Sequence, residues 1–487
     1  MKTILTSFIS TSLLALFCVT NDLAAAAEPG LPSDLLERAI YAEETKGDLN
    51  GAVALYQQLV SDAKATEKLA AQAQFRLGQC LLKLKRSTDA NAAFEKLIRD
   101  YPEEKQLIAK AKAQLPGAMT LGPVPWVDGE TLRFVMKLPT GLDLGAMTYR
   151  AESGQVGDRK VWRVGARIFA GGMMQSFSRV EADFNDFRPI SSRWKHSLIG
   201  DASVVYGPSS AQITVVGSPE PKVTPFDTPV YDNEEAVHLI RRLPLEVGYK
   251  TTVPILTGLG GGALIPIGVE VKSIDKLDVP AGHFECYRVD LSLNQTFWYT
   301  TDAHRYLAKL EAGGMTAELV AIEQRAAGQP VQFHDESTGV TLVAPDAWFI
   351  HKRAKGDGQE DEGSTEFYLM DPEADITMAL LKLHDTSKLN GGKNSPRVWA
   401  EARVMNLAKE MKDLKVRPES WKIISISGRP AVSFVADYID GKSPALLLGA
   451  YALGRAHSEE FVMTFKSDQL AGARPAFDSI VTNYRSK

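Results

Sequence analysis

Residues 71–102 read AQAQFRLGQCLLKLKRSTDANAAFEKLIRDYP. Apolar side chains recur in this stretch three and four positions apart, which is the period of an amphipathic helix. The apolar positions that would fill the seam between two helices are Leu77, Leu81, Phe94 and Leu97. Gly78 and Ala90 are small and stand where two antiparallel helices would touch, and Pro102 marks the end of the second helix. The stretch therefore predicts two packed helices joined by a short turn.

The same positions have the spacing of a helical repeat of about 34 residues. On Leu77, Gly78, Ala90, Phe94 and Pro102 the stretch resembles a tetratricopeptide (TPR) repeat. The alternative is an amphipathic hairpin that belongs to no repeat family. A repeat of this kind would supply a surface for a peptide or a protein partner and would not supply a catalyst.

An earlier helical pair is predicted before this stretch, within residues 31–70. It places Ala52 and Tyr56 where the later pair has Ala90 and Phe94, and Ala90 follows Ala52 by 38 positions. This spacing is a 34-residue period with a four-residue loop insertion. Residues 103–115 are amphipathic and are expected to cap the stack. The residues expected to pack the repeats are Leu77, Gly78, Ala90, Phe94, Ala52 and Tyr56.

The length and charge of the chain set its class. A chain of 487 residues predicts roughly three domains. Hydrophobic residues at 44% and charged residues at 24% are ordinary for a globular chain. The formal net charge of -5 offers no basic excess to neutralise phosphates, so we expect no nucleic-acid partner.

The N-terminus has the pattern of a secretory signal peptide at residues 1–27. Lys2 precedes an apolar run from Ile4 to Val19, and the small residues Ala24–Ala27 offer a cleavage point. Cys18 suggests the alternative of a bacterial lipoprotein, but Phe17 stands where such a signal has a small residue. We therefore expect an exported bacterial protein, periplasmic or extracellular, without a transmembrane segment after cleavage.

Residues 124–325 predict an antiparallel β domain. Short segments rich in β-branched and aromatic residues, such as VWRVGARIFA and HFECYRVDLSL, alternate with Gly, Pro, Asn and Asp. One interruption, Asp232–Arg242, predicts a short helix that begins with a capping residue and acidic side chains.

Three motifs of this region suggest a family. WVDGETLRF, PAGHFECYRVDL and FWYTTDAHRYLAKLE together resemble a bacterial envelope β-domain family of unknown function. The resemblance implies a fold and a location and brings no activity. A sheet of this length is expected to curl into an open barrel or a half-barrel.

Residues 331–487 predict an α/β domain after the linker 326–330. Strands are expected first, then a helix over residues 396–414, a meander of strands, and a final helix over residues 470–484. On GVTLVAPDAW, the GRPA turn and RPAFDSIVTNY, this region resembles the PsbP and Mog type of α/β/α sandwich. That resemblance implies protein binding. The whole chain is thus predicted to be a multidomain α+β protein.

A metal site requires His, Cys, Asp or Glu side chains at spacings that converge on one point. The eight histidines are scattered singly, and the closest cluster is His283, Glu285 and Cys286. In a strand His283 and Glu285 share one face and Cys286 lies on the other, so only two of them could bind one ion. Cys80 and Cys286, in different predicted domains, make no disulfide framework. We expect no metal site.

The other motifs that could serve chemistry have plainer interpretations. Gly258–Gly262 is followed by an apolar strand segment and not by a helix, so a hairpin turn is predicted in preference to a phosphate-binding loop. Glu360–Asp361–Glu362 lacks the ligand spacing of a calcium loop. No G-x-S-x-G motif occurs. No catalytic residue and no cofactor site is predicted.

The aromatic residues of the β domain suggest one further possibility. If the sheet curls, these side chains could line a cavity for an apolar ligand, although such residues more often form the core. They are Trp162, Phe169, Phe177, Trp194, Phe284, Phe297 and Trp298.

The sequence thus favours a non-enzymatic exported envelope protein. In the leading hypothesis it acts as an adaptor or scaffold that binds a protein or peptide at its short TPR module. The alternatives are a periplasmic carrier of an apolar ligand in the central β domain, and a hydrolase with an unrecognised site.

Overall fold

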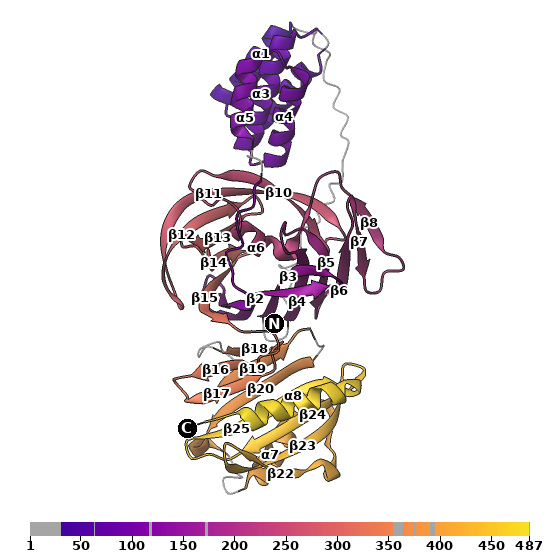
Figure 1. Ribbon diagram of the computed structural model, residues 1–487, viewed down its shortest axis with the longest axis vertical. Helices are drawn as coiled ribbons and strands as arrows, with labels where there is room; N and C mark the ends of the chain where they lie inside the picture. Colours follow the sequence, from indigo (N-terminus) through magenta and orange to yellow (C-terminus); the bar gives the residue numbers. More distant parts are fainter. Residues whose placement is uncertain are drawn as a thin grey trace.

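The computed structural model describes residues 31–62, 64–115, 119–170, 174–353, 364–373, 376–389 and 395–486. The predicted signal peptide at residues 1–27 and the acidic loop Glu360–Asp361–Glu362 lie outside these residues. A group of helices, a large curled sheet and an α/β unit follow one another along the long axis of the molecule (Figure 1). This architecture of N-terminal helices followed by a β-rich region is the one that the sequence predicts.

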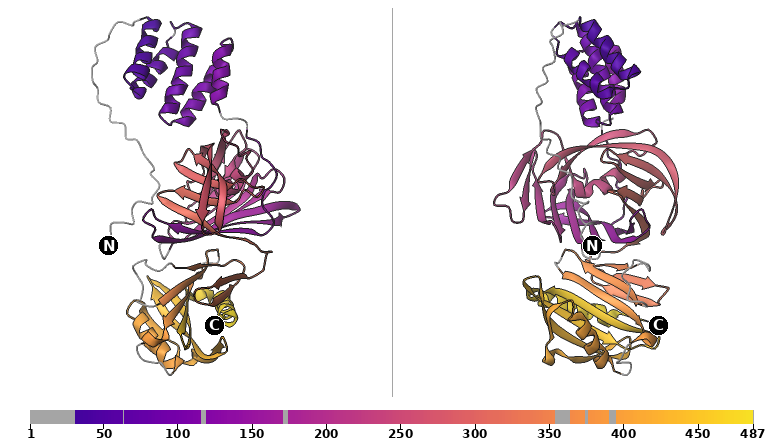
Figure 2. Two further views of the ribbon diagram at one scale, coloured as in Figure 1. Left: turned by 90° about the vertical axis from the view of Figure 1, so that its left-hand side faces the viewer. Right: turned by 180° about the vertical axis from the view of Figure 1, so that it is seen from behind.

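The N-terminal unit is built from antiparallel helices that lie side by side (Figure 2). Its elements are α1 (Pro32–Ile40), the π-helical turn η1 (Tyr41–Thr45), α2 (Leu49–Val60), α3 (Glu67–Lys83), α4 (Ser87–Asp100) and α5 (Lys105–Gln114). Asp48 caps α2 by accepting a hydrogen bond from the Gly51 backbone N–H, and Thr66 caps α3 in the same way through Leu69. Gly47 and Lys85, both with positive φ, turn the chain between helices.

Phe94 of α4 packs directly against Gly78 of α3. A Cβ atom built on Gly78 would lie 2.5 Å from Cε1 of Phe94, so only glycine leaves room for this ring. Leu77, Ala90, Phe94, Ala52 and Tyr56 belong to a single core. The structure therefore brings together the six residues that the sequence assigned to repeat packing.

Glu43 lies at the centre of a buried polar cluster in the same unit. Its carboxylate accepts hydrogen bonds from Tyr56 Oη at 2.7 Å, Lys83 Nζ at 2.7 Å and Arg76 Nη1 at 3.1 Å. Burial by itself raises the pKa of Glu43, but these donors outweigh burial and lower it, so the carboxylate stays charged. The cluster ties η1 to α2 and α3.

The central unit is one sheet of fifteen strands in the order β8-β7-β6-β5-β4-β3-β2-β1-β15-β14-β13-β12-β11-β10-β9. All neighbours are antiparallel except β9 and β10, which are parallel. The strands are β1 (Glu130–Lys137), β2 (Asp143–Val156), β3 (Arg159–Ala170), β4 (Met174–Asp183), β5 (Pro189–His196), β6 (Gly200–Tyr206), β7 (Ser210–Val215), β8 (Lys222–Pro225), β9 (Tyr231–Asp232), β10 (Lys250–Thr257), β11 (Ala263–Val279), β12 (Gly282–Leu291), β13 (Gln295–Thr300), β14 (Leu307–Ala312) and β15 (Met315–Gln324).

The sheet curls around a short helix, α6 (Ala236–Arg241), which follows the 3-10 turn η2 (Asn233–Glu235) (Figure 1). The predicted helix at this position is confirmed. Its capping residue is Asp232, whose backbone N–H donates to Glu235 Oε1 at 2.8 Å and whose Oδ1 accepts from the Glu234 N–H at 2.9 Å. Because β8 and β9 end the strand order without pairing to each other, the sheet is an open barrel.

The C-terminal unit has a hairpin, an eight-stranded sheet and two helices. The hairpin is β16 (Val331–Asp335) and β17 (Val340–Ala344). The sheet strands are β18 (Phe349–Lys352), β19 (Ser364–Asp371), β20 (Ile376–Asp385), β21 (Lys412–Val416), β22 (Lys422–Ile426), β23 (Arg429–Asp440), β24 (Ser443–Ala452) and β25 (His457–Lys466). The helices are α7 (Pro396–Leu407) and α8 (Leu470–Asn483), with 3-10 turns η3 (Thr386–Lys388), η4 (Pro418–Ser420) and η5 (Ser467–Gln469).

The two helices of this unit pack on opposite faces of its sheet. On β24, Leu446 and Leu448 share a core with Phe477 of α8, whereas Leu447 shares a core with Trp399 of α7. Alternate residues of a strand point to opposite faces, so the two cores lie on either side.

The predicted helix over residues 396–414 is too long. The helix α7 ends at Leu407, and residues 412–416 form the strand β21, which pairs with β23. Asp413 has a positive φ of 57°, which no α-helix interior accommodates. The apolar spacing of Met411 misled the prediction because this side chain packs on the same core as α7 from outside the helix.

The C-terminal unit contacts the outer face of β2, β3 and β4. Asp346 Oδ1 accepts hydrogen bonds from Arg150 Nη1 at 2.8 Å and from Arg325 Nη2 at 2.9 Å. Phe169 packs on Tyr368, with the ring centroids 5.2 Å apart. Glu373 pairs with Arg179 in the same region. These strands are therefore covered on their outer face, and any site within the curl must open elsewhere.

Candidate functional site

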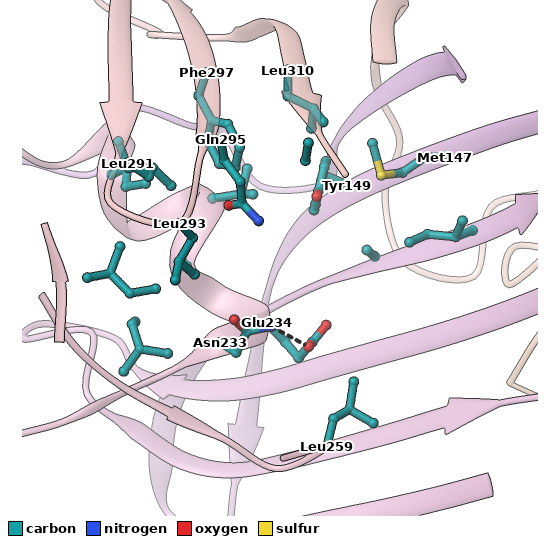
Figure 3. Close-up of a pocket in the computed structure, with 18 of the residues that line it drawn as sticks. Met147, Tyr149, Asn233, Glu234, Leu259, Leu291, Leu293, Gln295, Phe297 and Leu310 are labelled. Atoms are coloured by element: carbon teal, nitrogen blue, oxygen red, sulfur yellow. Dashed lines mark hydrogen bonds between the residues drawn. The ribbon is translucent and has the colours of Figure 1, made fainter. Parts of the chain in front are cut away.

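A cavity of about 400 Å³ lies inside the curl of the central sheet. Its walls come from strands that are distant in sequence, with Met147 and Ile168 on one side and Ile255, Val269 and Phe297 on the other. In Figure 3, Met147 and Phe297 extend from different strands that surround the lumen. The lining is mainly aliphatic, and the volume is within the range of about 300–1,000 Å³ typical of small-molecule sites.

The helix α6 divides the lumen into a hollow part and a filled part. Ala236, Leu239 and Ile240 line the cavity. Turned away from it, Arg241 donates from Nη1 to Glu130 Oε1 at 2.6 Å and from Nη2 to the His304 carbonyl at 2.7 Å. A buried, paired arginine is costly to displace, which holds α6 in place as the floor of the cavity.

Aromatic rings close the filled part behind α6. Trp126 lies with its ring centroid 5.3 Å from His238 and 5.8 Å from Trp162. Burial, with a smaller contribution from the charge of Arg241, lowers the pKa of His238 well below its ordinary value, so this imidazole is neutral. The packing explains why the cavity does not extend through the domain.

The cavity opens between three hairpin turns. Ile199, Leu259 and Leu293 line it and yet are 70%, 44% and 46% exposed. They lie on the turns β5–β6, β10–β11 and β12–β13. The glycine-rich segment Gly258–Gly262 is the middle turn, as predicted, and its role here is to form part of an apolar rim.

A few polar groups interrupt the apolar lining. The Glu234 carboxylate accepts a hydrogen bond from Asn233 Nδ2 at 2.9 Å, and both side chains stand at the start of the lumen helix (Figure 3). Burial, and then the negative charge of Asp232, raises the pKa of Glu234. His196 Nδ1 accepts from the Leu198 N–H at 3.1 Å, and burial lowers the pKa of His196. Gln295 also lines the cavity.

The aromatic residues proposed from the sequence are mostly not in the cavity. Of the seven, Trp194 and Phe297 line it. Trp162 packs in the filled part, Phe169 lies against the C-terminal unit, and Phe177 lies under Arg167, Arg179 and Arg193. Phe284 and Trp298 form a separate small core with Cys286. The cavity predicted from aromatic residues therefore exists with a largely aliphatic lining.

The sequence did not single out Glu234 as a cavity residue. The sequence predicts only an acidic residue in the first turn of a helix, and such a residue is common there because it stabilises the helix. The available signal was the order DNEEAVHLI, a polar run directly before an apolar helix within a β domain. In this curled sheet the helix lies in the lumen, and its polar start stands beside the cavity.

A second hollow lies on the helical unit, between α2, α3 and α4. This groove, of about 480 Å³, is more open and more polar, and its lining includes Gln57, Gln74, Leu77 and Lys96. Gln74 is 2% exposed, and its Nε2 donates to the Ala93 carbonyl at 2.9 Å. Its Oε1 has no hydrogen-bond partner. An unpaired buried amide oxygen next to a groove can accept a hydrogen bond from a bound peptide.

The residues considered for chemistry lie apart. Within the described part of the chain, no group of three His, Cys, Asp or Glu side chains is placed to hold a metal ion. His283 contacts Asp278 on the surface, whereas Cys286 of the same strand is buried. Cys80 and Cys286 are free, and burial raises the pKa of each thiol to about 12. Neither thiol is activated as a nucleophile.

Comparisons with protein families agree with two of the sequence resemblances. Residues 132–320 match the model of a protein family of unknown function, DUF3108, and residues 72–104 match a tetratricopeptide repeat model. The TPR repeat and the β-domain resemblance are thereby confirmed. No curated protein sequence matches the chain. Among the described helices, none is long and apolar enough to cross a lipid bilayer.

Several solved structures are similar to parts of the chain. Cyanobacterial PsbP from Synechocystis is 11% identical, covers 33% of this chain and 95% of its own, and has a TM-score of 0.28. LpqN of Mycobacterium tuberculosis is described as involved in cell envelope biogenesis. It is 11% identical, the match covers 33% of this chain and 91% of LpqN, and the TM-score is 0.21. A putative exported protein of Bacteroides fragilis with a YmcC-like fold is 10% identical. The match covers 42% of this chain and 100% of that protein, with a TM-score of 0.17. Because these TM-scores are low, we draw no conclusion about this chain from the three similarities.

Proposed function

We propose that this chain is a non-enzymatic, exported protein that binds an apolar or amphipathic ligand in its central β domain. The observation that carries the proposal is the cavity of about 400 Å³ with a mainly aliphatic lining and an apolar rim. The export signal predicted at residues 1–27 supports the location.

Burial of hydrocarbon supplies the binding energy in such a site. Each methylene group removed from water contributes about 0.8 kcal/mol. Ten buried methylenes therefore contribute about 8 kcal/mol before the cost of immobilising the ligand. The floor formed by α6 is fixed by the Arg241–Glu130 pair, so little of this energy is spent on ordering the site.

Native mass spectrometry of the freshly purified full chain tests the proposal. The expected result is a bound mass in the range of a lipid or another amphiphile, released at higher collision energy. A clean apo mass that stays unchanged after incubation with long-chain alcohols would overturn it. The alcohols are included because a carrier can lose its ligand during purification.

We also propose that the helical unit binds a protein or peptide partner, so that the chain works as an adaptor. The support is the groove beside α3, with the unpaired Oε1 of Gln74 at its wall. Crosslinking in the periplasm followed by affinity purification tests this role. Partners should be lost from the Gln74→Leu variant and retained by Glu220→Gln, an exposed change in the β domain. Partner recovery that does not depend on residues 31–115 would exclude the groove.

For the C-terminal unit we propose a PsbP or Mog type of interaction module. The helices α7 and α8 on opposite faces of one sheet support the α/β/α arrangement expected from the sequence. The hydrolase alternative stays a prediction. Ser176 and His196 lie opposite each other on β4 and β5 in the cavity lining, and His196 Nδ1 accepts a hydrogen bond from the Leu198 N–H.

A further inference from the structure

The charge of the cavity lining is unusual for a site that would hold a fatty acid. Among the described residues that line the cavity, Glu234 is the single carboxylate, no Lys or Arg occurs, and the basic group is His196, whose pKa is lowered by burial. A ligand with a carboxylate or phosphate head normally meets a cation or a cluster of backbone N–H donors. Here an anionic head would instead meet a carboxylate in a poorly hydrated site.

Glu234 is available to a ligand. The neighbouring acids are committed to the chain itself: Asp232 accepts Tyr206 Oη at 2.6 Å and the Glu234 N–H, and Glu235 caps the turn through the Asp232 N–H. The side chain of Glu234 accepts a hydrogen bond from Asn233, which is exposed, and also interacts with the buried Ser178 hydroxyl, so both of its described side-chain partners are neutral. The described groups that act on the pKa of Glu234 are Asp232, Asn233 and Ser178, and no Lys or Arg is among them. A cationic group on a ligand would thus supply the charge that this site lacks.

The position of Glu234 suits the head of an amphiphile. The carboxylate stands where α6 begins, and its neighbour Asn233 is exposed, so this end of the lumen meets solvent. The deeper lining, including Val253, Ile267 and Leu310, is apolar. A chain buried among these residues would leave its head near Glu234, with Gln295 as a second group able to accept a hydrogen bond.

We propose that the cavity selects amphiphiles with a protonated amine head over those with an anionic head, and that Glu234 is the residue that makes the selection. The inference rests on the proposed function, because it needs a ligand in the cavity. The ammonium group would donate hydrogen bonds to the Glu234 carboxylate, and the alkyl chain would occupy the apolar lumen. Pairing with the ammonium group would favour the charged form of this carboxyl and thus oppose the effect of burial, which raises its pKa.

A matched series of twelve-carbon ligands tests the selection. Dodecylammonium, dodecanol and dodecanoate would each be titrated at pH 8 against a bound apolar fluorescent probe, below the micelle concentrations of the two ions and below the solubility limit of dodecanol. The proteins are the full-length chain, Glu234→Gln, which keeps the shape of the side chain, and Glu220→Gln, an exposed control. For the wild-type chain and the control we expect dodecylammonium to bind about tenfold or more tightly than dodecanoate, since hydrogen bonds to charged groups are among the strong ones.

In Glu234→Gln the preference should fall to within about threefold, while dodecanol binds as it does to the wild-type chain. A preference that survives in Glu234→Gln, or dodecanoate binding as tightly as dodecylammonium to the wild-type chain, would overturn the selection by Glu234 and leave the carrier function standing. Failure of all three ligands, dodecanol included, would overturn the carrier function itself.

Discussion

Replacing Gly78 by alanine tests the helix packing of the repeat unit. The new Cβ would lie 2.5 Å from Cε1 and 2.7 Å from Cζ of Phe94, distances that non-bonded carbon atoms do not reach. Phe94 has no exposed surface, and the Phe75 ring, 5.7 Å away between centroids, restricts its movement. The helices α3 and α4 must therefore move apart.

The expected magnitude combines two opposing terms. Alanine is about 1 kcal/mol better than glycine inside a helix. Overpacking of a core costs about 1–3 kcal/mol. Gly78→Ala should therefore destabilise the repeat unit, by up to about 2 kcal/mol. The matched control is Gly472→Ala in α8, where a Cβ would meet nothing within 4 Å and the helix should gain about 1 kcal/mol.

Hydrogen exchange of the full-length chain, read by mass spectrometry, measures each unit separately. Peptides from residues 67–100 should exchange faster in Gly78→Ala, and peptides from residues 470–483 should exchange more slowly in Gly472→Ala. Adding Phe94→Leu to Gly78→Ala should recover part of the lost protection, because the two sites share one contact. Slower exchange of α3 and α4 in Gly78→Ala than in the wild-type chain would refute the packing.

Three further predictions concern charge and the cavity. Glu235 is buried with one oxygen unpaired, and burial, followed by the charge of Asp232, raises its pKa well above the ordinary value. Ionisation thus favours the unfolded chain, so Glu235→Gln should raise the Tm at pH 8, and this gain should disappear as the pH falls below 4.5, where the unfolded carboxyl also becomes protonated. Glu460 accepts hydrogen bonds from His384 Nε2 at 2.7 Å and from Arg403 Nε at 3.0 Å, and these partners outweigh burial and lower its pKa. Glu460→Gln should lower the free energy of unfolding, measured in urea at pH 7, by about 3 kcal/mol. This loss should become smaller as the pH falls below 4.5 and through the pKa of Glu460 in the folded chain. Primary alcohols of increasing length should bind about fourfold more tightly per added methylene until the lumen is full, and a flat calorimetric series would contradict burial of the chain.

The repeat unit was predictable because its signals are local. Helical periodicity, the small residues Gly78 and Ala90, and Pro102 act within one stretch of chain. The end of α7 was not predictable in this way, because the strand at residues 412–416 forms only by pairing with β23. Whether the chain continues as a helix after Leu407 or leaves it, the apolar spacing at Met411 is the same, so this spacing could not decide between the two structures.

The cavity residues depended on which face of each strand points inward. Ile168, Ser176 and Phe297 line the cavity, while their neighbours Phe169, Phe177 and Trp298 point to the other side of the sheet. Adjacent residues of a strand cannot share a face. The aromatic residues alone therefore could not reveal the lining, because the inward face is set by how the whole sheet curls.

A titration with an apolar fluorescent probe tests the central claim, a ligand site inside the curled sheet. The proteins are the wild-type chain, the double variant Ala166→Phe/Ala312→Phe, which places two rings in the lumen, and Val205→Phe, which adds a ring at an exposed position outside the cavity. The wild-type chain and Val205→Phe should show one saturable site, and the double variant, folded as judged by its thermal unfolding, should show none. Saturable binding of equal strength in all three proteins would contradict a ligand site in this cavity.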